Sequence, residues 1–312
     1  MGIIVFESLL PVLLIIITGL GLRKCRIVTE ENWLGIELLT YWLLFPVLVV
    51  VSLIQMDLSK INLGSLTKGY LLAVIAQLII VWLLKKPLHR HLSVSDRSFS
   101  SIFQTATRWN AFIALAIAFN FAGNEGLAIV SLIMALTLPI LNFVNVVVLT
   151  ICCSETKPTL ATTVINTLKV PLIWGALLGL SLNIAEITVY KPLMVSLDII
   201  GRAGLGIGLL TVGAGLHTHA ILNARMTMMI SIVAKLIVFP LLVFASCMLF
   251  DVGGLTLQMA MLSASVSTAM NGYILARQMG GDADLYAATA SLQVVISMVS
   301  IPLVLWLVSG FV

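Results

Sequence analysis

Long runs of apolar residues, separated by short breaks rich in charge, Gly, Pro or Asn, dominate this chain. The apolar residues follow one another without the two-residue alternation of a transmembrane β-strand, so the runs indicate helices. A helix needs about 20 such residues to cross the roughly 30 Å hydrocarbon core of a bilayer. The pattern predicts ten membrane-spanning segments, at residues 2–22, 34–54, 69–84, 99–121, 127–150, 170–187, 193–215, 227–250, 255–279 and 286–312.

The composition supports an all-α membrane protein and gives no sign of an enzyme. Of the 312 residues, 60% are hydrophobic and 10% are charged, which leaves too little polar surface for a soluble domain of this size. HExxH, GxSxG and GxxxxGKS/T motifs are absent from the sequence, so no zinc or serine hydrolase and no ATP-driven pump is indicated. The four cysteines lack metal-site spacing and are interpreted as free thiols; we expect no cofactor, metal or nucleic-acid partner.

The distribution of Lys and Arg predicts the orientation in the membrane, because these residues are retained on the cytoplasmic side during insertion. Eleven lie on one set of loops and segment ends: Arg23, Lys24, Arg26, Lys85, Lys86, Arg90, Arg97, Lys157, Lys169, Arg225 and Arg277. Three lie on the opposite set: Lys60, Lys68 and Lys191. With ten crossings, this bias predicts a multi-pass protein of the bacterial inner membrane with both termini in the periplasm.

The two halves of the chain repeat each other weakly. PVLLIIITGLGL begins at Pro11 and PLIWGALLGLSL at Pro171, an offset of 160 residues, and Asn110 matches Asn271 with an offset of 161. Chance similarity of apolar sequences is the alternative explanation, but two matches with nearly one offset favour a repeat. Repeats of five crossings must have opposite orientations, as in many secondary transporters. We predict a first five-helix repeat at residues 1–150 and a second, inverted repeat at 151–312.

Polar residues are concentrated in the fourth and ninth segments, which must therefore lie in the protein interior. Asn110 and Asn271 occupy equivalent repeat positions, where asparagine can interrupt a helix and offer polar groups to a ligand. Joining neighbouring helices is the alternative role for such residues. We predict a substrate site at Asn110 and Asn271, with Thr268 beside it.

Arg108 lies about ten residues into the fourth segment, roughly 15 Å deep at the helical rise. A guanidinium at that depth needs a cavity, a carboxylate or an anionic ligand. Attraction of a substrate anion and a structural ion pair are both consistent with this position.

The remaining intramembrane charges suggest structural roles. Asp198 and Arg202 are one helical turn apart and are expected to form a local ion pair. Lys235 is expected to extend its amine toward the cytoplasmic face. Solvated or interfacial positions are expected for five further residues: Glu37, His89, His91, His217 and His219.

Four stretches resemble the auxin efflux carrier family, which includes bacterial malonate and malate permeases. They are YWLLFP at 41–46, RWNAFIALAIAF at 108–119, FAGNEG at 121–126 and STAMNGYILARQMGG at 267–281. The resemblance implies ten helices in two inverted repeats, with the fourth and ninth helices broken and crossing. It also implies a scaffold of helices 1, 2, 6 and 7 that forms a dimer interface, and a mobile transport domain made of the other six helices.

The resemblance places the crossing at Asn110 and Asn271, flanked by Trp109, Ala111, Ser267 and Gly272. Family members often have proline at these crossings, whereas this chain has Trp109 and Ser267. Each interruption must then rely on asparagine, Gly272 and packing.

These observations together predict a secondary transporter of small carboxylates that works by alternating access. An anion channel and a membrane sensor that binds its ligand without moving it remain alternatives. The expected partners are a small organic anion, H⁺ or Na⁺ as a coupling ion, membrane lipid and a second copy of the chain.

Overall fold

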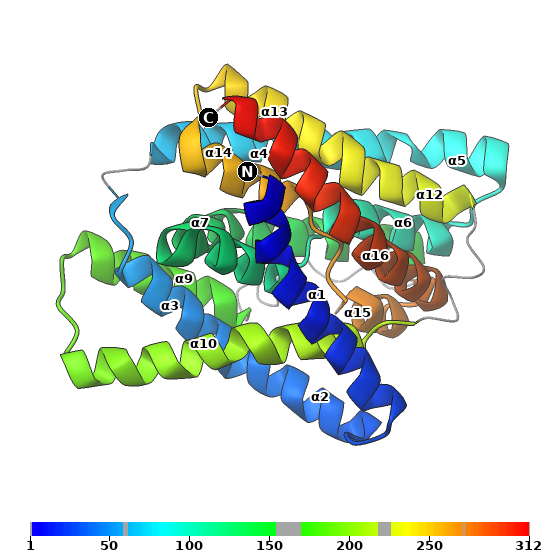
Figure 1. Ribbon diagram of the computed structural model, residues 1–312. Helices are drawn as coiled ribbons and strands as arrows, with labels where there is room; N and C mark the ends of the chain where they lie inside the picture. Colours follow the sequence, from blue (N-terminus) through cyan, green and yellow to red (C-terminus); the bar gives the residue numbers. More distant parts are fainter. Residues whose placement is uncertain (1, 59–61, 154–169, 218–225, 271, 312) are drawn as a thin grey trace.

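The computed structural model describes residues 2–58, 62–153, 170–217, 226–270 and 272–311 (Figure 1). All regular secondary structure in these ranges is helical, as the apolar pattern predicts. Seven helical stretches are long and apolar enough to cross a membrane, and the apolar helix Pro171–Ile184 is shorter. The chain is therefore an all-helical, multi-pass membrane protein.

The helices in the first half of the chain are α1 (Gly2–Lys24), α2 (Glu30–Leu39), α3 (Phe45–Ile54), α4 (Leu63–Leu83), α5 (Lys85–Leu92), α6 (Asp96–Thr107) and α7 (Ala111–Cys153). Those in the second half are α9 (Pro171–Ile184), α10 (Lys191–Ala214), α12 (Met226–Val233), α13 (Phe239–Leu249), α14 (Gly254–Ser265), α15 (Gly272–Gln278) and α16 (Ala283–Val308). The π-helical turns η1 (Thr40–Leu44) and η3 (Ala234–Val238) join α2 to α3 and α12 to α13, and the short turn η4 (Ser309–Phe311) follows α16.

Four helices, α2, α4, α6 and α16, begin at least three residues earlier than the apolar pattern predicts, because polar residues cap them. Helix α4 starts six residues before the predicted position, where the Asn62 side chain accepts a hydrogen bond from the Ser65 amide at 3.1 Å. Helix α16 starts after Asp282, whose carboxylate accepts from the Leu285 amide at 3.1 Å. Each cap satisfies an otherwise unpaired amide of the first turn, so the helix extends beyond its apolar run.

Both π-helical turns precede a proline in the second position of the next helix, Pro46 in α3 and Pro240 in α13. Proline lacks the N–H that would bond to the carbonyl four residues earlier, and its ring crowds that carbonyl. A wider turn just before the proline relieves this conflict while the helix continues.

Helix α7 bends sharply at Ala122 and Gly123, where the backbone leaves the helical region. Gly123 has a φ of +58°, which glycine adopts without the steric cost that other residues meet. A straight helix of this length would span about twice the hydrocarbon thickness. The bend therefore divides α7 into two parts, between the predicted fourth and fifth segments.

Helix packing divides the described chain into two groups. In the panel group, α1 packs extensively on α10, and α3 packs on α9 and α10, with α2 and η1 alongside. In the core group, α4 packs on α13, and α6, α7, α14 and α16 pack on one another, with α12, η3 and α15 around them. In Figure 1, α2, α3, α9 and α10 lie together in the lower part of the molecule. The two groups meet chiefly where α7 and α16 contact α1, α3 and α10.

Glycines allow the panel helices to approach closely. A Cβ added at Gly201 of α10 would lie 2.8 Å from the Leu48 Cα of α3, and one at Gly175 of α9 would lie 2.9 Å from the Pro46 carbonyl oxygen. A Cβ at Gly213 would overlap the Ile16 carbonyl of α1. Such small-residue contacts are the usual basis of tight helix packing in membranes, where water does not drive association.

Candidate substrate-binding site

The first helix interruption lies at residues 108–110, between α6 and α7. Arg108 has an extended backbone, with φ −71° and ψ 158°. The Asn110 side-chain oxygen then accepts hydrogen bonds from the Phe112 and Ile113 amides, at 3.1 and 3.3 Å, and so caps α7. Asparagine is among the best N-cap residues, so this interruption forms without proline.

The second interruption lies between α14 and α15, and its described residues are 266–270. Val266 has nearly the same extended backbone as Arg108, with φ −70° and ψ 155°. Asn271, which the repeat pairs with Asn110, lies outside the described residues. The Tyr286 hydroxyl of α16 donates to the Ala269 carbonyl at 2.6 Å. A Cβ at Gly272 would overlap the Tyr286 ring, so glycine is needed at the start of α15.

Hydrogen bonds join the two interruptions directly. The Asn110 amide donates to the Ser267 carbonyl at 2.8 Å. From α16, the Gln293 side chain donates to the Thr105 carbonyl at 3.0 Å and accepts from the Thr268 amide at 2.9 Å. Gln293 thus holds the end of α6 and the second interruption together inside the core group.

Side chains also cap the carbonyl ends of the two half-helices. The Gln77 amide of α4 donates to the Ala106 carbonyl at 3.0 Å and to the Ala234 carbonyl at 2.8 Å. At the end of α14, the Lys235 amine donates to the Ala264 carbonyl at 3.0 Å and is fully buried. The expectation that Lys235 extends toward the cytoplasmic face is therefore wrong, because its amine turns inward to a helix end that attracts positive charge.

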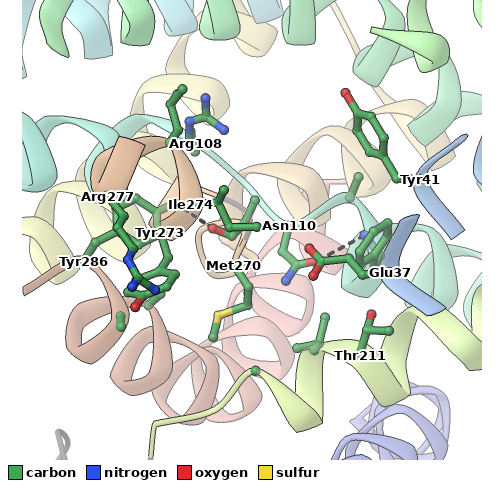
Figure 2. Close-up of a pocket in the computed structure, with 18 of the residues that line it drawn as sticks. Glu37, Tyr41, Arg108, Asn110, Thr211, Met270, Tyr273, Ile274, Arg277 and Tyr286 are labelled. Carbon is green, nitrogen blue, oxygen red and sulfur yellow. Dashed lines mark hydrogen bonds between the residues drawn. The ribbon is translucent and has the colours of Figure 1, made fainter. Parts of the chain in front are cut away.

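A pocket of about 1160 Å³ lies between the two groups, beside the first interruption (Figure 2). Its lining from the panel group includes Arg23, Trp33, Glu37, Tyr41 and Thr211. Its lining from the core group includes Arg108, Trp109, Asn110, Ala111, Met270, Tyr273, Arg277 and Tyr286. This cavity thus opens at the contact surface between two helix groups, a position expected for a ligand site.

Positive charge predominates among the described residues of this pocket. Arg23, Arg108 and Arg277 line it, whereas Glu37 is the one carboxylate of the lining. Arg108 is 8% exposed, so its charge is largely shielded from solvent. Within the described residues, the Asn110 amide nitrogen has no hydrogen-bond partner, although it is buried. A buried donor in a positive cavity suits an anionic ligand with acceptor oxygens.

The structure places the predicted site residues in two layers. Arg108, Trp109, Asn110 and Ala111 line the pocket. Ser267, Thr268 and Gly272 are buried behind its lining, where Ser267 and Thr268 bond through their backbones to the residues named above. The Trp109 indole lies 3.3 Å from the Thr137 hydroxyl and donates to it.

Sequence reasoning missed several residues that form or support the site. Glu37 and His217 were expected at solvated positions, yet both line the pocket. Tyr286 and Gln293 lie in the tenth segment, which was not singled out, although a lone glutamine in an apolar run is a usable signal.

Two other expectations concern the panel group. The Asp198–Arg202 ion pair is confirmed, with 2.7 Å between the side-chain nitrogen and oxygen. Arg23 was placed at a loop, but its guanidinium donates to the Ala214 carbonyl at 2.6 Å. It therefore binds the carbonyl end of α10, where a positive charge is favourable.

Comparisons with known proteins identify the wider family. The model of the membrane transport protein family matches residues 154–305, from the start of the second half to the last turns of α16. A search of curated proteins finds no match. The matched residues include one of the four stretches that resemble auxin efflux carriers, residues 267–281 at the second interruption, while the stretch 108–119 that contains Asn110 lies before the match. Residues 154–305, just under half of the chain, thus match the family of membrane transport proteins to which the auxin efflux carriers belong.

Proposed function

We propose that this protein is a secondary transporter that moves a small organic anion, such as a carboxylate, across the inner membrane by alternating access. The observation that carries the proposal is the positively charged pocket at the junction of two interrupted helices, between two helix groups. An anion there can meet Arg108 and the Asn110 amide, which both line the pocket. Interrupted helices that expose polar groups are the usual substrate sites of secondary transporters.

The proposed fold has ten crossings in two inverted repeats, residues 1–150 and 151–312. Helix pairing supports it: α1 packs on α10 and α3 packs on α9. In the proposed repeat, α1 corresponds to α9, and α2 with α3 corresponds to α10. Exchanging the two halves therefore converts the α1–α10 pair into the α9–α3 pair. The segments that follow the two interruptions are the first part of α7, before its bend, and α15. Each ends near a glycine of positive φ, Gly123 at +58° and Gly280 at +80°.

Alternating access would arise from movement of the core group along the panel group. The pocket supports this because residues of both groups line it, so a relative shift changes which side of the membrane it faces. We also propose a homodimer through the outer face of the panel group, where apolar side chains such as Trp174 are exposed. Native mass spectrometry that shows only monomers in lipid would contradict the dimer.

The proposed orientation has both termini in the periplasm and the α5 region in the cytoplasm, following the Lys and Arg bias. Cysteine labelling tests it. A His89→Cys variant in intact cells should resist an impermeant thiol reagent, and labelling there would reverse the assignment.

Flux measurements in proteoliposomes test the function itself. The proposal predicts saturable uptake of at least one of a set of small mono- and dicarboxylates, accelerated by unlabelled substrate on the opposite side. A conductance that does not saturate would indicate a channel instead. Binding without any flux would indicate a sensor.

A further inference from the structure

Lys235 is a fully buried amine that the proposed substrate site does not use. It lies in the π-helical turn η3, inside the core group. Its hydrogen bond to the Ala264 carbonyl is the one that the described residues offer, although an ammonium has three N–H donors. The Phe239 ring lies under the amine, 4.5 Å from nitrogen to ring centroid. The aromatic face and the helix end attract positive charge, but neither carries a full negative charge.

The surroundings of Lys235 hold no buried carboxylate within the described residues. The turn η3 packs against α4, α6, α12, α13, α14 and α16. The charged residues on these helices are Lys68, Asp96, Arg97 and Asp284, and all of them are exposed. Their other titratable groups are Tyr70, Cys247 and Tyr286, a phenol, a thiol and a phenol that are ordinarily neutral near pH 7. An ammonium at Lys235 is thus compensated only by dipoles.

Comparison of the two half-helix ends shows that capping does not require a charge. At α6, the neutral amides of Gln77 and Gln293 bond the Ala106 and Thr105 carbonyls. At α14, an ionisable amine takes this role. The amine adds one property that an amide lacks, because it can gain or lose a proton.

The substrate pocket lies close enough to influence that proton. Ala264 is three residues before Ser267, whose carbonyl accepts from the Asn110 amide. Three residues span at most about 11 Å. A hydrogen bond at each end adds to this separation, and at an effective dielectric constant of about 20 one negative charge roughly 12 to 20 Å away changes a protonation equilibrium about four- to tenfold. An anion beside Asn110 therefore supplies part of the negative charge that the buried ammonium lacks.

We infer that Lys235 is a proton-binding site that couples anion transport to proton transport in the same direction. This inference rests on the proposed transport function and names its coupling ion. When the anion binds, the Lys235 lone pair takes a proton from water and becomes an ammonium, and the core group moves with both. When the anion leaves, the N–H bond breaks, the proton returns to water on the other side, and the core group returns with a neutral amine.

Proteoliposomes with radiolabelled malonate, a small dicarboxylate, test the coupling. With acid outside and neutral buffer inside, the parent protein should accumulate malonate above equilibrium. A Lys235→Met variant keeps the length of the side chain without an ionisable group. It should still exchange malonate for malonate but lose the accumulation that the pH gradient drives. Accumulation by this variant at the parent level would overturn the inference, as would accumulation driven by a sodium gradient at equal pH.

A binding measurement guards against a variant that folds poorly. Malonate added to the purified parent protein in weakly buffered solution should cause proton uptake, seen with a pH indicator. The parent affinity should fall about four- to tenfold as the pH rises and Lys235 loses its proton, whereas Lys235→Met should bind weakly at every pH. A Lys235→Arg variant, which stays charged, should bind without proton uptake. Malonate exchange by the parent without proton uptake would overturn the coupling alone; absence of any malonate or other carboxylate flux would overturn the proposed function as well.

Discussion

The helix after the first interruption is capped by a residue of that interruption, whereas the described residues of the second interruption are bonded by side chains of α16. At residues 108–110, Asn110 caps α7 through the Phe112 and Ile113 amides. At 266–270, Gln293 and Tyr286 of α16 bond the Thr268 amide and the Ala269 carbonyl. The cap at Asn110 is local and can be predicted from the sequence around it, whereas the contacts that Gln293 and Tyr286 make with the second break cannot be predicted from the residues of that break.

Gln293 should have the largest effect on stability, because it serves both interruptions. Gln293→Leu leaves the Thr105 carbonyl and the Thr268 amide without this partner, at about 1–3 kcal/mol for each orphaned group. Thermal unfolding of the purified protein in detergent should show a clear loss. The matched control is Gln104→Leu, because the Gln104 amide is fully buried and has no hydrogen bond among the described residues. Equal losses for both variants would contradict the bridging role.

Gly272→Ala should destabilise the second interruption through overlap with the Tyr286 ring. Overpacking of this kind costs about 1–3 kcal/mol, which detergent unfolding should detect. Gly253→Ala is the control, because a Cβ there meets no atom within 4 Å. Equal stability of Gly272→Ala and Gly253→Ala would show that α16 can shift to make room for the added methyl group without loss of stability.

Substitutions of Asn110 should distinguish its role as a helix cap from its proposed role in substrate binding. Asn110→Ser keeps a capping oxygen but removes the amide nitrogen that faces the proposed anion, so stability should hold while affinity falls. Loss of a hydrogen bond to a charged ligand costs about 1.5–3 kcal/mol, or roughly tenfold or more. Asn110→Ala should lose the same affinity and also about 1 kcal/mol of stability with the cap. Unchanged affinity in Asn110→Ser, measured by carboxylate binding, would remove Asn110 from the substrate site.

Ser267 should have the smallest effect. Its carbonyl accepts from Asn110, but its hydroxyl has no partner among the described residues. Ser267→Ala keeps the carbonyl, so unfolding should change by less than about 0.5 kcal/mol. A loss as large as that of Gln293→Leu would mean that the hydroxyl, and not the backbone, joins the two interruptions.

The sequence predicts the helical class and part of the site. The physical reason for the apolar helices differs from the reason for the break at Asn110. Apolar runs predict helices because a segment in the hydrocarbon core must pair its own backbone polar groups. Asn110 predicts a break because it caps a helix through amides only two and three residues away. The direction of the Lys235 side chain was wrong and the position of Glu37 in the pocket lining was not predicted, because helix position alone does not show which neighbour a long side chain will meet. Gln293 acts across 188 residues of chain, from α16 to the Thr105 carbonyl. Such a contact leaves no periodic pattern in the sequence.

The central claim is that the pocket at Asn110 binds the transported anion and faces each side of the membrane in turn. A single cysteine at Ala111, in a variant whose four native cysteines are replaced by serine, tests it directly, because Ala111 lines the pocket. In oriented vesicles, an impermeant thiol reagent should label Ala111→Cys from either side, and a transported carboxylate should slow the labelling. Labelling from one side only, at a rate that the transported carboxylate does not change, would contradict the account.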